Sequence, residues 1–219
     1  MTRVKICGIT EKSHALAAIE AGSDFIGLVF APSRRQVSIV QAQEIVGIIK
    51  ERSNTTEVVG VFVNVPAPVV NSTAAACNLD RVQLSGDESW AYCCEINQPL
   101  IKAVRVSQGQ DPEGICDFLT IGDEVLSDRG HIFLLDSLVE GSYGGTGITS
   151  DWEMCREIAI RFPVIIAGGL TPETVARAIE VVSPWGVDVS SGVESNGIKD
   201  TARIKAFVGA VRRADGRKE

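Results

Sequence analysis

The chain has 219 residues, 45% of them hydrophobic, and a formal net charge of −7 at pH 7. This length and apolar content are enough for a sizeable core, and we expect a single domain spanning residues 1–219. The acidic balance argues against a nucleic-acid partner, which would need a basic patch. No apolar run approaches the ~20 residues of a membrane span, and the N-terminus lacks a signal-peptide pattern. We therefore expect no membrane association.

The six cysteines and two histidines do not follow a metal-ligand pattern. No two cysteines have the C-x-x-C spacing, and His14 and His131 lie far apart in the chain. The sequence therefore argues against a zinc site, and a chain with this much apolar content does not need a disulfide framework. We expect reduced thiols and a cytoplasmic location. The sequence leaves open whether the protein is a monomer or a homodimer.

Short apolar segments recur along the chain and predict β-strands. Their apolar character is nearly continuous, which is typical of parallel strands buried on both faces of a sheet. The predicted strands are Val4–Cys7, Phe25–Phe30, Val58–Val63, Arg81–Leu84, Leu100–Val106, Ile132–Asp136, Val164–Ala167 and Val187–Ser190.

Helical patterns lie between these strands. Ser38 is a predicted N-cap, Gly22 a predicted C-cap, and Thr171 a predicted N-cap followed by Pro172 in the first turn. The predicted helices are Lys12–Ala21, Ser38–Arg52, a helix from Pro66 or Pro68 to Cys77, Asp87–Ile96, at most one helix near Pro112–Leu119, Asp151–Phe162, Thr171–Val182 and Ile198–Arg213.

Eight strands alternating with about eight helices predict an α/β fold, a single (β/α)₈ TIM barrel. The alternative, an open doubly wound sheet, usually has fewer strands and a G-x-G-x-x-G turn after its first strand. This chain has Gly8-Ile9-Thr10 at that position instead. In a TIM barrel the chemistry is carried by residues at the carboxyl ends of the strands, so the strand ends are the places to search.

The first predicted strand ends in Cys7 and breaks at Gly8. A thiolate is the reactive form of cysteine and needs a cationic or dipolar neighbour. Lys5 lies two residues earlier, on the same strand face, and could favour that thiolate. The alternative is that Cys7 is a small buried hydrophobic residue, because free cysteine often packs as one.

Side-chain parity predicts a partner for Lys5. If Cys7 faces the barrel lumen, so does Lys5, and a buried lysine must be paired. If Ser190 faces the lumen, so does Asp188, and its strand closes the barrel against the first strand. We therefore expect Lys5 and Asp188 to form an ion pair inside the barrel.

Glycine-rich segments follow the last three predicted strands. Backbone N–H groups in such loops can cradle a phosphate, and barrels commonly bind phosphate after strands 7 and 8. Gly168-Gly169 and Ser190-Ser191-Gly192 stand in those positions and are the candidate phosphate-binding segments. The alternative is that these glycines only form tight turns.

Two further groups could take part in chemistry. Asp136 ends a strongly apolar strand, where burial should raise the pKa of its carboxyl group and suit it to act as a general acid. The alternative is a helix cap or an ion-pair partner. Arg34-Arg35, in the loop after the second strand, could bind a carboxylate through two hydrogen bonds. The alternative there is a solvated basic turn.

The motifs together resemble the phosphoribosylanthranilate isomerase family of tryptophan biosynthesis. The resemblance runs from Val4 to about Phe207, and it is specific because of the number of the motifs and their order along the chain. The motifs are V-K-I-C-G-I-T (4–10), G-L-V-F-A-P-S-R-R (27–35), G-V-F-V-N (60–64), V-Q-L-S-G (82–86), I-K-A-V-R-V (101–106), L-L-D (134–136), Y-G-G-T-G (143–147), P-V-I-I-A-G-G-L-T-P-E (163–173) and V-D-V-S-S-G-V-E (187–194). Ser85 stands where the family usually has a histidine.

The resemblance implies an Amadori rearrangement of N-(5-phosphoribosyl)anthranilate without a cofactor. By the same resemblance, Asp136 protonates the ribose ring oxygen, Cys7 removes the C2 proton and Arg35 binds the substrate carboxylate. Phosphate is implied at Gly169, Ser191 and Gly192, with Gly147 added, and Lys5 and Asp188 would support the base. Two residues of one site must then hold opposite protonation states at one pH.

Two other readings stay open on the sequence. One is another phosphosugar barrel enzyme, such as an epimerase or the related isomerase of histidine synthesis. Metal-dependent epimerases need histidine and carboxylate ligands that these strand ends lack. The other is a catalytically silent binding protein that keeps the barrel and the phosphate loops, and the departure at Ser85 is its only support.

Overall fold

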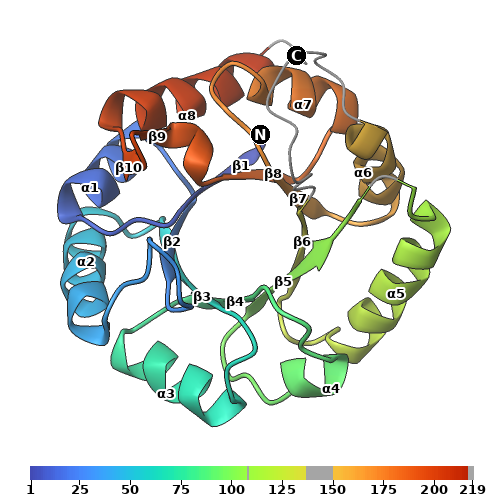
Figure 1. Cartoon of the computed structure of the whole chain (residues 1–219), viewed down its shortest axis with the longest axis horizontal. Coiled ribbons are helices and arrows are strands. Elements are labelled where there is room, and N and C mark those ends of the chain that lie inside the picture. The colour runs from blue at the N-terminus through green and yellow to red at the C-terminus, as the bar shows by residue number, and fades with distance from the viewer. Residues whose placement is uncertain (108, 137–149, 217–219) are drawn as a thin grey trace.

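The computed structural model describes residues 1–107, 109–136 and 150–216. Eight parallel strands close into a barrel in chain order, with β8 paired to β1 (Figure 1). This confirms the predicted TIM barrel. The strands are β1 (Arg3–Cys7), β2 (Phe25–Val29), β3 (Glu57–Phe62), β4 (Arg81–Leu84), β5 (Leu100–Arg105), β6 (Ile132–Asp136), β7 (Val164–Ala167) and β8 (Gly186–Val189).

The helices form a ring outside the strands (Figure 1). As predicted, the Ser38 side chain caps its helix by accepting a hydrogen bond from the backbone N–H of Gln41, and Gly22 ends the first helix in the left-handed conformation. No helix in the described part of the chain is long and apolar enough to cross a membrane. The helices are α1 (Lys12–Ala21), α2 (Ile39–Arg52), α3 (Ala67–Ala76), α4 (Trp90–Cys93), α5 (Pro112–Val125), α6 (Ser150–Arg161), α7 (Val175–Val182) and α8 (Thr201–Asp215).

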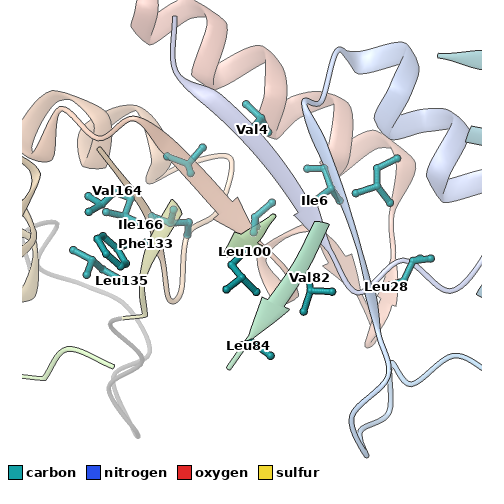
Figure 2. Close-up of a cluster of buried hydrophobic side chains, with 14 of the residues drawn as sticks. Val4, Ile6, Leu28, Val82, Leu84, Leu100, Phe133, Leu135, Val164 and Ile166 are labelled. Atoms are coloured by element: carbon teal, nitrogen blue, oxygen red, sulfur yellow. The ribbon is translucent and has the colours of Figure 1, made fainter. Parts of the chain in front are cut away.

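Strand parity divides the core into two layers. Val4 and Ile6 of β1 belong to the larger apolar cluster, which fills the space between strands and helices (Figure 2). A smaller cluster fills the barrel lumen with Phe25, Val59, Ile101, Leu134, Ile165 and Ala167. Because neighbouring side chains on a strand point to opposite faces, Lys5 and Cys7 of β1 face this lumen. The outer face of β1 therefore packs against the helices, while its inner face presents Lys5 and Cys7 to the lumen.

Three predicted helix boundaries are wrong. Thr171 does not cap α7; residues 171–174 form their own turn, in which the carbonyl of Thr171 accepts from the N–H of Val175, and the helix starts at Val175. Near Pro112–Leu119 the helix α5 continues to Val125. Between Asp87 and Ile96, only Trp90–Cys93 is helical.

The start of the last helix is also different from the prediction. The segment Ile198–Lys199 is not helical; it forms strand β10, which pairs with β9 (Glu194–Ser195) in a hairpin. The turn residues Asn196 and Gly197 have φ values of 54° and 79°, the combination that a tight two-residue hairpin turn requires. The helix α8 then begins after Asp200, whose side chain accepts from two N–H groups of its first turn.

The seam between β1 and β8 contains the predicted ion pair. Lys5 and Asp188 are paired in register, and Lys5 Nζ lies 3.0 Å from Asp188 Oδ1 with the lysine completely buried. Burial alone would lower the pKa of Lys5, but attraction to Asp188 and Cys7 outweighs it, and the pKa lies above its ordinary value. The lysine is therefore charged inside the barrel because its partner is there.

We expect Asp188→Asn to lower the free energy of unfolding by about 3 kcal/mol or more near pH 6, because it leaves Lys5 as a buried charge without compensation. With only Cys7 left to oppose desolvation, we expect the pKa of Lys5 to fall below its ordinary value. A depressed amine pKa costs stability at low pH, and the cost shrinks as the amine deprotonates. Urea unfolding should therefore show a smaller loss near pH 9.

The control for this prediction is Glu113→Gln, which breaks an exposed ion pair with Arg161. Solvent and salt screen an exposed pair, so this variant should show little change at either pH. An equal loss of stability for Asp188→Asn at both pH values would contradict the assignment of the pair.

Replacement by alanine should change the free energy of unfolding in opposite directions at two helical glycines. At Gly122 in α5, an added Cβ would lie 2.6 Å from Trp90 Cη2, whereas at Gly47 in α2 it would meet nothing within 4 Å. Overpacking typically costs about 1–3 kcal/mol, more than the ~0.5–1 kcal/mol that alanine gains in a helix. Chemical unfolding should show Gly122→Ala destabilised and Gly47→Ala stabilised; the same sign for both would contradict this.

Candidate active site

The predicted base, Cys7, lies at the carboxyl end of β1 next to a glycine of β2. A Cβ at Gly27 would lie 2.9 Å from Cys7 Sγ and 3.1 Å from Lys5 Nζ. Only glycine therefore leaves room for both the thiol and the amine on the lumen side of this strand pair. Cys7 itself is 8% exposed, so only a small part of it contacts solvent.

Burial raises the pKa of the Cys7 thiol above its ordinary value. The positive charge of Lys5 opposes this shift, as does Lys199 at longer range, while Asp188 adds to it. The sequence-based expectation that Lys5 favours the thiolate is thus correct in sign, but it does not prevail against desolvation. Without substrate, the neutral thiol predominates at pH 7.

The predicted acid, Asp136, lies half-buried at the carboxyl end of β6. Its register partners are Arg105 on β5 and Ala167 on β7. Asp136 lines a cavity of about 320 Å³ together with Ser85, Lys102 and Arg105, among others. The carboxyl group therefore opens onto a space large enough for part of a small molecule.

A buried ion pair that the sequence reading missed fixes one wall of this cavity. Lys102 Nζ donates to Glu88 Oε2 at 2.8 Å and to the carbonyl of Gly86 at 2.7 Å. The carboxylate of Glu88 also accepts from the backbone N–H groups of Asn64 and Gly86. Burial alone would raise the pKa of Glu88, but these bonds lower it below its ordinary value. In the sequence, the sign of such a pair is Lys102, a lysine within a largely apolar predicted strand.

The predicted carboxylate ligand, Arg35, contacts Glu194. Arg35 Nε donates to Glu194 Oε1 at 2.6 Å, and Nη2 donates to Oε2 at 3.0 Å. Arg34 and Lys199 donate to the same carboxylate at 2.7 and 2.8 Å. Arg35 is therefore part of an ionic cluster that the sequence did not predict. The alternative prediction, a solvated basic turn, is wrong for Arg35.

The predicted phosphate loops lie at the ends of β7 and β8. Gly169 has φ of 64°, and a Cβ there would meet nothing within 4 Å. A Cβ at Gly192 would lie 1.8 Å from the carbonyl oxygen of Leu170, so the two loops touch at that glycine. Ser191 begins a 3₁₀ turn, Ser191–Val193. The remaining predicted residue, Gly147, lies outside the described residues.

The described residues bring most of the predicted site to one end of the barrel, because the carboxyl ends of all eight strands meet there. Within residues 1–107, 109–136 and 150–216, no group of three His, Cys, Asp or Glu side chains could hold a metal ion. What the arrangement offers is a thiol, a carboxyl group, an arginine and open backbone loops. Such a set can exchange protons with a bound anionic molecule.

Comparisons with known proteins agree on one protein family. The family model described as N-(5'-phosphoribosyl)anthranilate (PRA) isomerase matches residues 4–210. Proteins with that name from Dehalococcoides mccartyi and Roseiflexus sp. are 44% and 46% identical, covering 99% and 98% of this chain and 98% and 99% of their own lengths.

Solved structures agree with this comparison. The phosphoribosyl anthranilate isomerase of Thermotoga maritima is 39% identical with a TM-score of 0.81, over 99% of this chain and 100% of that one. A second isomerase structure, in complex with reduced 1-(o-carboxyphenylamino)-1-deoxyribulose 5-phosphate, is 37% identical with a TM-score of 0.80, over 97% and 100%. The chain therefore belongs to the N-(5'-phosphoribosyl)anthranilate isomerase family.

Proposed function

We propose that this protein converts N-(5-phosphoribosyl)anthranilate to 1-(2-carboxyphenylamino)-1-deoxyribulose 5-phosphate in tryptophan biosynthesis, with Cys7 as general base and Asp136 as general acid. Family membership supports the reaction. The observation that carries the assignment of roles is the position of a thiol and a carboxyl group at the carboxyl ends of β1 and β6 of one barrel. The free cysteines of the chain favour the reducing cytoplasm as the place of action.

The first step is ring opening. Asp136, in its protonated form, gives its proton to the ribose ring oxygen while the bond between that oxygen and C1 breaks. The C1–O electron pair stays on the ring oxygen, which becomes a hydroxyl group, and the lone pair of the anthranilate nitrogen forms the C1–N double bond. The substrate is then a positively charged Schiff base, and Asp136 is left as a carboxylate that balances the charge. A carboxyl group that lines a cavity at the carboxyl end of its strand suits this role, because a bound sugar could lie within reach of its proton.

The second step is proton abstraction. Cys7, as thiolate, removes the proton from C2, and the C2–H electrons form a double bond to C1 as the Schiff-base nitrogen gains the C1–N electrons. The resulting enolamine tautomerises to the ketone. Lys5 lies under the thiol at the end of its own strand, and its positive charge stabilises the thiolate when it forms.

The remaining predicted residues at the mouth of the barrel would bind the anionic groups of the substrate. Arg35 would bind the anthranilate carboxylate, and the phosphate would sit over Gly169, Ser191 and Gly192. Gly169 supports this role because its loop leaves open space above the backbone, where N–H groups can approach a phosphate. With its two anionic groups bound in this way, the substrate would have its ribose between the acid and the base.

Replacing either proton-transfer group should remove most of the rate. General acid–base catalysis contributes about 10²- to 10⁴-fold, so kcat of Cys7→Ser and of Asp136→Asn should each fall by about that factor. Affinity for the reduced product analogue should change little, because neither group holds its anions. A fluorescence assay of substrate consumption and calorimetry with the analogue measure the two quantities.

The matched control is Cys94→Ser, which changes a thiol at the end of α4, outside the lumen. It should keep wild-type turnover. Near-wild-type kcat in Cys7→Ser or Asp136→Asn would contradict the role of that residue, and wild-type protein without any turnover would show a binding protein that has lost catalysis.

The pH dependence of kcat/KM should be flat around neutrality. The productive pair has Cys7 ionised and Asp136 protonated, so it holds one proton, and the alternative form with that proton on Cys7 has the same net charge. Since pH does not alter the ratio of two forms with equal charge, the rate changes only where the pair gains or loses a proton. Burial raises the pKa of Cys7, so the alkaline fall should lie above the ordinary thiol value of about 8.5. A fall below about pH 8 would contradict this.

A further inference from the structure

The Glu194 carboxylate joins three cationic side chains from two distant segments of the chain. Arg34 and Arg35 approach from the loop after β2, and Lys199 approaches from β10, with N–O distances of 2.6 to 2.8 Å. The side chain of Glu194 is only 4% exposed. A buried carboxylate between three cations keeps its charge, and the cluster as a whole retains an excess of two positive charges.

The hairpin of β9 and β10 sets the position of this carboxylate. Glu194 and Lys199 are directly paired across the two strands, which brings their side chains to the same face. The turn at Asn196 and Gly197 fixes that register, and a Cβ at Gly197 would lie 3.1 Å from Arg34 Nη1. The hairpin is therefore a rigid support packed under the arginine loop.

The same hairpin also supports the end of β8. Lys199 Nζ donates to the carbonyl of Ser190 at 2.8 Å and lies 3.3 Å from its hydroxyl. Ser190 immediately precedes the Ser191–Gly192 loop of the proposed phosphate site. One carboxylate thus connects, through Lys199 and Arg35, the two places where the substrate's anions would bind.

The contacts of Arg35 leave one edge of its guanidinium available. Glu194 takes Nε and one Nη2 hydrogen, while no hydrogen bond among the described residues uses Nη1. The arginine stem crosses Gly8, where a Cβ would lie 2.5 Å from Arg35 Cδ, so the group lies beside the end of the strand that carries Cys7. A guanidinium held by one edge can still bind a carboxylate with the other.

We propose that Glu194 is a positioning residue that orients Arg35 toward the carboxylate of the anthranilate substrate. This inference rests on the proposed function, in which Arg35 binds that carboxylate. Burial would raise the pKa of Glu194, but the bonds from Arg35 and Lys199 lower it to about 2. Glu194 therefore stays ionised across the working pH range and exchanges no proton with the substrate.

The test is Glu194→Gln, which keeps the shape but replaces one acceptor oxygen by an NH₂ group that faces arginine donors. Losing charge-assisted hydrogen bonds of this kind weakens binding by about 10- to 100-fold. We expect KM for N-(5-phosphoribosyl)anthranilate to rise by that factor and kcat to change by less than about 3-fold. We also expect the variant to lose most of the wild-type preference over N-(5-phosphoribosyl)aniline, which lacks the carboxylate.

These readouts do not depend on how much of the variant folds. Partial misfolding lowers the measured kcat, but KM and the preference ratio between two substrates belong to the folded fraction alone. A lowered kcat with unchanged KM and unchanged preference would overturn the proposal. The control is Glu113→Gln, which breaks another arginine–carboxylate pair with two hydrogen bonds, to Arg161 on the outer helices. It should change neither KM nor the preference between the two substrates.

A double-mutant cycle separates this proposal from the proposed role of Arg35. If Glu194 acts through Arg35, Glu194→Gln should raise KM by less than about 3-fold in the Arg35→Ala background. A full increase there would overturn the positioning role while leaving Arg35 as the carboxylate ligand. If Arg35→Ala alone leaves KM and the preference unchanged, the proposed role of Arg35 is wrong, and the positioning role fails with it.

Discussion

The active end of this barrel depends on one buried ion pair, between Lys5 and Asp188 at the seam where β8 closes against β1. Neither charge could stay inside the lumen alone, because the desolvation cost of an unpaired buried ion is several kcal/mol. The pair puts a positive charge beneath Cys7 without exposing it to water. The same contact therefore lies at the seam that closes the barrel and keeps next to Cys7 the positive charge that opposes the effect of burial on its thiol.

Buried charge is used twice more around the mouth, each time to fix a loop. Lys102 and Glu88 hold the loop after β4 against the wall of the cavity that Asp136 faces. Glu194 holds the loop after β2 against the hairpin after β8. Loops that carry function are usually the mobile parts of a fold, and here buried carboxylates restrain them. Restraint of this kind reduces the ordering cost of binding a substrate with two anionic groups.

The fold and much of the site could be predicted because both follow from local pattern and strand parity. The apolar strand segments gave the barrel, and alternation along β1 and β8 gave the Lys5–Asp188 pair. The pKa of Cys7 could not be read in the same way, since it depends on how completely the folded lumen excludes water. The Glu194 cluster was missed because its members come from segments about 160 residues apart, as Arg35 and Glu194 show.

The hairpin after β8 has a local signal in the sequence. Asn196-Gly197 is the strongest short-range hairpin signal, and it lies between residues that pair across the turn. A helix drawn from Ile198 hides that signal and also moves Lys199 off the strand on which it meets Glu194. The local turn therefore has a consequence far from it in the chain: by fixing Glu194, it determines which edge of the Arg35 guanidinium is bonded to that carboxylate, beside the end of β1.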